Sequence, residues 1–182
     1  LDLCAAPGGK SLQLAAAGWE VIALDVSAKR LVRLEENLAR TSLAAQVVTA
    51  DALTWQPDAP FDAILLDAPC TATGTCRRHP DVLHRIGPRQ IGEMAELQTR
   101  LLERAATWLK PGGQLVYAVC SLEREEGDDQ AATVTLAAEP ITAAELPDGV
   151  LPDATGYVRT DPGMGADAGG MDGFFIARWR KG

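Results

Sequence analysis

The sequence predicts an α/β fold in which a mostly parallel sheet carries helices on both faces. Three observations support this prediction. Strand-like and helix-like runs alternate along most of the chain, a glycine-rich turn joins the first strand to the first helix, and a polar residue follows each of several strands. Ligands of open parallel sheets bind beyond the carboxyl ends of the strands, so these polar residues mark the predicted site.

The first ten residues, LDLCAAPGGK, contain a strand, a turn and the start of a helix. Residues 1–3 are the end of a strand, residues 7–9 form the turn, and a helix-like run covers residues 11–17. Glycines let the backbone approach a ligand closely, and a helix N-terminus presents free N–H groups. The turn matches neither the dinucleotide pattern G-x-G-x-x-G nor the phosphate loop. We therefore expect another ligand that contains adenosine.

The next elements follow from apolar patterning. Ser27 is a suitable helix N-cap, and Leu31, Leu34 and Leu38 follow it at helical spacing. Short apolar runs before and after this helix are typical of buried strands. In chain order, we predict a strand over residues 20–24, a helix over 27–41, a strand over 46–49 and a strand over 61–66.

The second half of the chain begins with a long helix over residues 88–109, which has apolar side chains on one face. Residues 110–113, Lys-Pro-Gly-Gly, are predicted to stop this helix. A strand over residues 114–119 and a last strand over 173–179 follow. The Pro- and Gly-rich stretch between them predicts loops, with a short strand near residues 157–158.

Length and composition indicate one globular domain. The chain has 182 residues, of which 47% are hydrophobic. No apolar run reaches the ~18 residues that span a bilayer, and no N-terminal segment resembles a signal peptide. We therefore expect a cytoplasmic protein without a membrane partner. Because the sequence opens at a strand end and without a Met, we also expect a fragment of a longer protein.

The formal net charge of −8 argues against a nucleic-acid partner, because phosphate binding requires Lys and Arg. The charge is uneven, however, since arginines gather in residues 77–90 and basic residues recur in 178–181. These segments are either local RNA-binding patches or ordinary solvated surface. The four cysteines have no C-x-x-C pairing and no zinc spacing with the histidines, so we expect free thiols and no metal site.

The polar residues at the predicted strand ends are Cys4, Asp25, Asp51, Asp67 and Cys120. Asp25 can accept hydrogen bonds from both hydroxyls of a ribose, or it can cap the helix that follows. Asp51 can accept from the exocyclic amine of an adenine, although Asp is also common in loops. Cys4 lies inside the turn, where its backbone matters more than its sulfur.

Residues 67–70, Asp-Ala-Pro-Cys, place a carboxylate and a thiol together at the sheet edge. The Asp67 carboxylate can bind the ring nitrogen and amine of a nucleobase, and the Cys70 and Cys120 thiols are candidate nucleophiles. Lys10 can stabilise a developing negative charge or lower the pKa of a thiol. The alternative is that the cysteines are inert packed residues and that Lys10 is an exposed residue at a helix start.

The motifs in residues 2–10, 67–70, 77–81 and 119–121, together with DGFFIAR in residues 172–178, resemble those of the Sun/Fmu-type RNA (cytosine-5) methyltransferases. The resemblance covers nearly the whole chain, in the same order. It implies a Rossmann-like methyltransferase fold with a mostly parallel seven-stranded sheet, of which the first strand is truncated here. It also implies that residues 1–182 are a catalytic domain that uses S-adenosylmethionine and that an upstream RNA-binding domain is missing.

The resemblance further implies a role for each motif residue. The cofactor would contact Cys4, Ala5, Ala6, Pro7, Gly8, Gly9 and Lys10, with Asp25 at its ribose, Asp51 at its adenine and Asp67 between cofactor and target base. Cys120 would attack the cytosine, Cys70 would assist product release, and Lys10 and Asp67 would support catalysis. The partner would be RNA, in particular small-subunit ribosomal RNA, and the protein would be a monomer.

Two positions depart from the family pattern. Val119 precedes the nucleophile where Thr is common, and Thr71 follows Cys70 where Ser is common. Val119 cannot donate a side-chain hydrogen bond near Cys120, whereas Thr71 keeps a hydroxyl. Three alternatives stay open at this point: the two cysteines exchange roles, the enzyme methylates an exocyclic amine, or the protein is an RNA-binding assembly factor without turnover.

Overall fold

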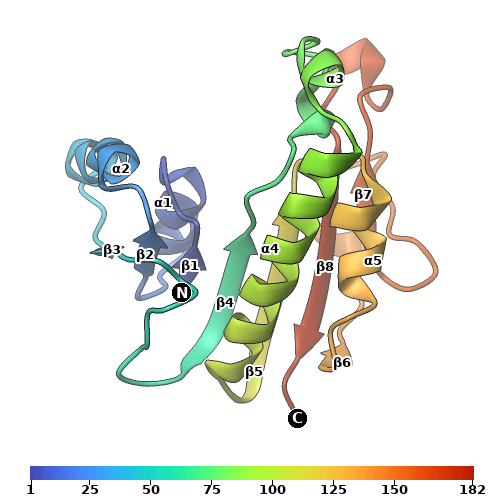
Figure 1. Ribbon diagram of the computed structural model, residues 1–182. Helices are drawn as coiled ribbons and strands as arrows, with labels where there is room; N and C mark the ends of the chain where they lie inside the picture. The colour runs from blue at the N-terminus through green and yellow to red at the C-terminus, as the bar shows by residue number, and fades with distance from the viewer.

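The computed structural model describes residues 1–182, with the side chain of residue 168 left out. Its sheet has eight strands, one more than predicted, in the order β3-β2-β1-β4-β5-β8-β6, with β7 paired to β8 off this path (Figure 1). Pairing is parallel from β3 to β5, and β8 runs antiparallel to β5, β6 and β7. The mostly parallel α/β fold is confirmed.

The first half of the chain follows the predicted order. Its elements are β1 (Asp2–Leu3), α1 (Gly9–Ala16), β2 (Ile22–Asp25), α2 (Ala28–Thr41), β3 (Gln46–Thr49) and β4 (Phe61–Asp67). Ser27 caps α2, because its side chain accepts a hydrogen bond from the Arg30 N–H. Leu31, Leu34 and Leu38 are the buried residues of that helix, as their spacing predicts.

The second half contains α4 and two long strands. Its elements are η1 (Thr73–Thr75), α3 (Val82–Arg85), α4 (Pro88–Thr107), β5 (Leu109–Val119), η2 (Arg124–Glu126), α5 (Asp128–Ala131), β6 (Ala137–Ala138), η3 (Ala143–Glu145), β7 (Val158–Thr160), η4 (Ala166–Ala168) and β8 (Phe174–Arg180). The short helices and β6 escaped prediction, because one helical turn or two strand residues cannot display a period.

One boundary differs from the prediction. The helix α4 ends at Thr107, and residues 110–113 belong to β5 instead of forming a separate stop. The register between β4 and β5 shifts between Phe61 and Ala63, which accommodates the extra residues as an irregularity. The Gly112 N–H donates to the carbonyl of Lys181 at 2.8 Å, so the neighbouring chain satisfies this part of the backbone.

Helices cover both faces of the sheet, because successive strand residues point to opposite sides. Leu24 belongs to a core cluster with Leu101 and Leu102 of α4, whereas the adjacent Ala23 packs with Leu31 and Leu34 of α2. Figure 1 shows α4 in front of β4 and β5. No helix among the described residues is long and apolar enough to cross a membrane.

The strand order reverses direction at β1, which lies between β2 and β4. The chain moves outward to β3 on one side of β1 and to β5 on the other. Strand order of this kind leaves a crevice at the carboxyl ends of the central strands. The predicted site residues follow these strands, so the fold gathers them along one edge.

Candidate active site

The first loop follows β1 and depends on Gly8. The Gly8 N–H donates to the Ala5 carbonyl at 2.8 Å, and the Ala5 N–H donates to the Leu24 carbonyl at 3.0 Å. Gly8 has a φ of 103°, and a Cβ at this position would lie 2.6 Å from Leu34 Cγ. Only glycine allows both this backbone conformation and the close approach of α2. The loop is thereby held against β2, next to Asp25.

Asp25 ends β2 with a carboxylate that is only 2% exposed. One carboxylate oxygen accepts from the Ala6 N–H at 3.1 Å, and the other accepts from the Ser27 N–H at 2.8 Å. Arg30 approaches the same carboxylate at 3.5 Å and donates to the Ala6 carbonyl. The helix cap is therefore Ser27, and Asp25 connects the first loop to the end of β2.

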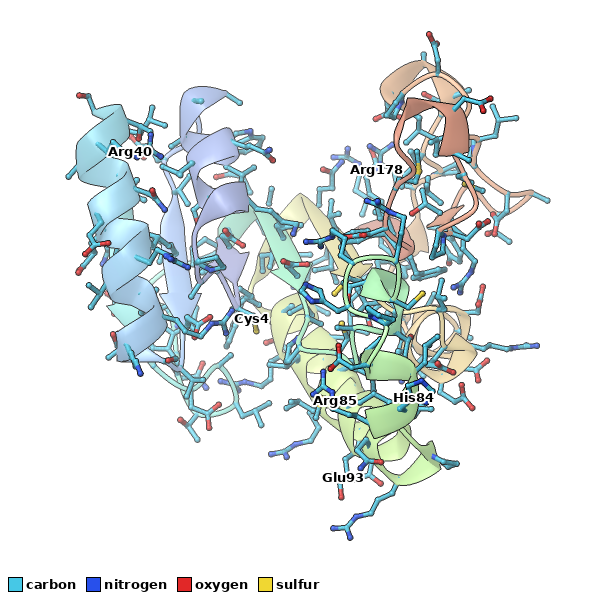
Figure 2. All side chains as sticks on the ribbon, turned by 90° about the horizontal axis from the view of Figure 1, so that it is seen from above. Cys4, Arg40, His84, Arg85, Glu93 and Arg178 are labelled. Carbon is cyan, nitrogen blue, oxygen red and sulfur yellow. The ribbon has the colours of Figure 1, made fainter. Side chains whose placement is uncertain are left out.

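A cavity of about 290 Å³ lies beside this loop, with Cys4, Asp25, Asp51, Leu53 and Leu97 among its lining residues. Asp51 is exposed, and its carboxylate accepts from the Leu53 N–H at 2.9 Å. Asp25 and Asp51, which were predicted to bind a ribose and an adenine, therefore line the same largely apolar cavity. In the view from above, Cys4 lies near the middle of the molecule (Figure 2).

The surroundings of Cys4 are acidic. Burial, together with the nearby carboxylates of Asp25, Asp67 and Asp2, raises the pKa of the Cys4 thiol to about 12. This thiol stays protonated, as expected for a residue that contributes its backbone. Arg30 is paired with Asp25 and Lys10 with Asp67, so part of this negative charge is neutralised and Asp2 adds to what remains.

Lys10 and Asp67 form an ion pair, with 2.6 Å between Lys10 Nζ and Asp67 Oδ2. Each side chain is about one-third exposed, so both groups can reach a ligand. Phe174 of β8 borders the pair, because Lys10 Nζ lies 5.9 Å from the centre of its ring. The ammonium of Lys10, the carboxylate of Asp67 and an aromatic face therefore meet at the ends of β4 and β8.

Asp2 is a site residue that sequence reasoning missed. It is fully buried in β1, and burial raises the pKa of its carboxyl group to about 6. Ser11 donates to Asp2 Oδ2 at 2.5 Å, whereas Asp2 Oδ1 has no hydrogen-bond partner among the described residues. The sequence pattern could have indicated it, because a charged residue between two leucines of a buried strand is unusual.

The two predicted thiols are in contact, with 3.4 Å between Cys70 Sγ and Cys120 Sγ. The hydrogen bond from Cys70 lowers the pKa of Cys120, and the Lys10 ammonium acts in the same direction. Conversely, this bond and burial raise the pKa of Cys70. The arrangement favours a thiolate on Cys120 and a proton on Cys70. Val119 cannot donate a side-chain hydrogen bond to Cys120, but Cys70 lies within hydrogen-bond distance of it.

Backbone contacts hold the loops around these thiols. The Gly74 N–H donates to the Cys120 carbonyl at 3.0 Å, and the Gly173 N–H donates to the Gly74 carbonyl at 2.7 Å. A second cavity, of about 480 Å³, is lined in part by Cys70, His79 and Met94. Cys76 is a free and partly buried thiol.

The basic segment at residues 77–90 is largely neutralised. Arg78 pairs with Asp172 of the loop before β8, Arg85 pairs with Asp81 at 2.8 Å, and Arg89 pairs with Glu93 at 2.8 Å. In Figure 2, Arg85 and Glu93 lie on α3 and α4 at the same side of the molecule. Arg77 is exposed and has no ion-pair partner among the described side chains.

Comparisons with known proteins agree with the predicted resemblance. The family described as 16S rRNA methyltransferase RsmB/F matches residues 1–180. The ribosomal RNA small subunit methyltransferase B of Shewanella oneidensis is 42% identical over 186 residues, which cover 100% of this chain and 42% of that protein. The protein of the same name from Cronobacter sakazakii is 43% identical, with coverage of 100% and 42%.

A solved structure agrees as well. NSun6 from Pyrococcus horikoshii, determined with SFG, superimposes with a TM-score of 0.86 at 32% identity, covering 99% of this chain and 47% of that one. The chain therefore spans about 42% of the length of the curated relatives that it matches over its full extent. With this match over residues 1–180, the chain belongs to the 16S rRNA methyltransferase RsmB/F family.

Proposed function

We propose that the protein transfers a methyl group from S-adenosylmethionine to C5 of a cytosine in 16S ribosomal RNA, through a covalent adduct on Cys120. The observation that carries the proposal is the contact of two thiols, 3.4 Å apart, beside the Lys10–Asp67 pair. A nucleophile and a proton carrier at adjacent strand ends are what C5 substitution of a pyrimidine requires. Family membership supports the same reaction.

The residues around the 290 Å³ cavity fit this cofactor. Asp25 and Asp51 would hold the ribose and adenine, and the backbone of residues 4–10 would surround the rest of the molecule. The acidic surroundings of Cys4 suit a ligand that carries an ammonium and a sulfonium. When bound, S-adenosylmethionine supplies an electrophilic methyl group.

Cys120 would act first, because its thiolate can add to C6 of the cytosine. The Sγ–C6 bond forms as the C5–C6 double bond opens, and the electron pair moves to C5. Asp67 would accept a hydrogen bond from the exocyclic amine of the base. Lys10, paired with Asp67, would stabilise the negative charge that develops on the ring.

Cys70 would act last, because a methylated C5 still carries its proton. Removal of that proton returns the electron pair to the C5–C6 bond and expels the Cys120 thiolate. Cys70 lies in contact with the departing sulfur, so it can give its own proton to the Cys120 thiolate and, as the thiolate so formed or through a water that it positions, take up the C5 proton. The base must leave the RNA stack to reach the thiols.

The alternatives explain less of this geometry. Methylation of an exocyclic amine gives Cys120 no task, and an assembly factor without turnover needs no activated thiol. An exchange of the two cysteines stays open until the adduct is mapped, because the two sulfurs lie 3.4 Å apart and either can donate to the other. We also infer that residues 1–182 form the catalytic domain of a longer monomeric protein, which binds RNA through a further domain and acts in the cytoplasm.

Nucleoside mass spectrometry of unmodified small-subunit ribosomal RNA, after incubation with the whole protein and S-adenosylmethionine, tests the reaction. We expect 5-methylcytidine with the wild type and none with Cys120→Ala. RNA that contains 5-fluorocytidine tests the adduct, because fluorine cannot leave C5 as a proton does and the enzyme stays attached. An adduct with Cys120→Ala would assign the nucleophile to Cys70, and N4-methylcytidine would support the amine alternative.

A further inference from the structure

Glu126 is a buried carboxylate that the reaction outlined above does not use. It ends η2 and has no exposed surface. Among the described side chains, it forms no ion pair with a lysine or an arginine. Burying a carboxylate costs several kcal/mol unless hydrogen bonds compensate it. The position of this charge therefore requires an explanation.

The donors to Glu126 come from the loops that carry the two thiols. The Thr71 N–H donates to Oε1 at 2.9 Å, and the Thr71 hydroxyl donates to Oε2 at 2.5 Å. The Ser121 hydroxyl also donates to Oε2. Thr71 directly follows Cys70, and Ser121 directly follows Cys120. One carboxylate thus links both catalytic loops through residues adjacent to the thiols.

Gln98 of α4 completes the arrangement. Its side-chain amide donates to Glu126 Oε1 at 3.1 Å and to the Pro69 carbonyl at 2.9 Å, so it connects Glu126 to the residue before Cys70. Thr73 adds a second connection, because its hydroxyl lies 3.2 Å from Ser121 Oγ and accepts from the Leu122 N–H at 3.0 Å. The network joins the loop after β4, helix α4 and the segment after β5.

We propose that Glu126 is a positioning residue that holds the Cys70 and Cys120 loops in contact and keeps the shared proton on Cys70. The proposal rests on the function assigned above, in which Cys120 is the nucleophile. The part of the proposal that concerns the position of the loops follows from the four hydrogen-bond donors to Glu126. Its electrostatic part follows from the sign of the charge, because a carboxylate near Cys70 opposes a second negative charge on that sulfur.

The charges around the network agree with this role. The hydrogen bond with Cys120 and burial contribute most to the raised pKa of Cys70, and the Glu126 carboxylate adds to them. At Cys120, the Asp67 carboxylate raises the pKa and the Lys10 ammonium lowers it. From β5, the Tyr117 hydroxyl donates to the Glu126 carbonyl at 2.6 Å, and burial raises the pKa of this phenol, so it stays neutral. From α5, Asp128 is paired with Arg159 at 2.5 Å, and α4 contributes the uncharged Gln98.

Glu126→Gln tests the proposal in the whole protein, because it removes the charge and keeps the shape. The Thr71 and Ser121 hydroxyls can turn to accept from the new amide, so the fold can persist. Iodoacetamide labelling of each cysteine, mapped by mass spectrometry from pH 6 to 10, reports where the proton resides. We expect Cys120 to react first in the wild type, and Cys70 labelling relative to Cys120 to rise about threefold or more in Glu126→Gln.

Glu125→Gln is the matched control, because Glu125 precedes Glu126 on η2 and its side chain is exposed. It removes the same charge and is expected to leave the labelling ratio unchanged. Glu126→Asp keeps the charge on a shorter side chain and is expected to restore a wild-type ratio with slower methylation. A folded Glu126→Gln protein with a wild-type ratio would overturn the proposal, even if its melting temperature fell.

Ser121→Ala serves if Glu126→Gln does not fold. It removes one donor and leaves the carboxylate in place, so we expect a shift of the ratio in the same direction by a smaller factor. An unchanged ratio in that variant would also count against the proposal. Labelling needs neither RNA nor cofactor. A wild type that labels as expected but forms no 5-methylcytidine would therefore overturn the proposed function alone.

Discussion

Asp2 shows what a single buried carboxyl group does to the pH dependence of stability. Its pKa rises from 3.8 to about 6, chiefly through burial, and the Ser11 hydrogen bond opposes part of this shift. The folded protein therefore holds the Asp2 proton between about pH 4 and 6, where the unfolded chain has lost it. Stability from this group is present at low pH and is lost as the pH rises through this window.

Asp2→Asn is expected to remove the loss of folding stability that Asp2 causes as the pH rises. In the absence of cofactor, the variant should gain up to about 3 kcal/mol of unfolding free energy relative to wild type at pH 7, at about 1.4 kcal/mol per pKa unit. The gain should shrink toward zero at pH 4. Urea unfolding at both pH values measures it. Asp58→Asn, at an exposed loop position, should change stability by less than about 0.5 kcal/mol at either pH.

At the scale of the elements, the loops at the carboxyl edge of the sheet contact one another through their backbones. Gly74 of η1 lies between the Cys120 carbonyl and Gly173. A Cβ at Gly74 would meet the Gly173 oxygen at 2.0 Å and the Cys120 oxygen at 3.0 Å. Such backbone contacts cannot adjust as a flexible side chain can, so the three loops depend on this glycine.

Gly74→Ala is expected to destabilise the protein by about 1–3 kcal/mol, as overpacking does, and to weaken the contact between the thiols. Gly92→Ala is the matched control, because Gly92 lies within α4 with open space around it. That variant should gain about 0.5–1 kcal/mol, since alanine costs less conformational entropy in a helix. Equal thermal stability of the two variants would contradict the contact described for Gly74.

At the scale of the whole chain, the net charge of −8 means that the proposed RNA substrate would have to bind through a local region. The arginines of residues 77–90 lie at the thiol side of the sheet, but Asp172, Asp81 and Glu93 neutralise three of them. Phosphate must compete with these carboxylates. Exposed ion pairs are worth at most about 1 kcal/mol, so such competition is possible and costs affinity.

Asp172→Asn is expected to free Arg78 and to strengthen RNA binding. The slope of log K against log salt should steepen by about 0.7, the contribution of one phosphate contact to a single strand. Asp62→Asn is the matched control: it removes the same charge, but Asp62 pairs with Lys110 at the opposite end of β4. Equal slopes for the two variants, measured by fluorescence anisotropy, would exclude Arg78 from the RNA contact.

Several features of this protein could be predicted from local patterns. The leucines after Ser27 specify α2, and the apolar runs that end at Asp25 and Asp67 specify β2 and β4, because each signal lies within one element. Parallel topology then places Lys10, Asp67, Cys70 and Cys120 at one edge. The start of β5 could not be predicted, because a Lys-Pro-Gly-Gly segment usually ends an element, whereas here it is part of the strand.

The sequence by itself determined the family, the alternation of strands and helices and the residue types at the sheet edge. Only the tertiary structure decided which groups touch. Cys70 and Cys120 are 50 residues apart, Lys10 and Asp67 are 57 apart, and Thr71 and Glu126 are 55 apart. The protonation state of a thiol depends on such neighbours and on burial, which no local pattern records. Glu126 carried no signal in the sequence, because its role arises from the donors that the fold brings to it.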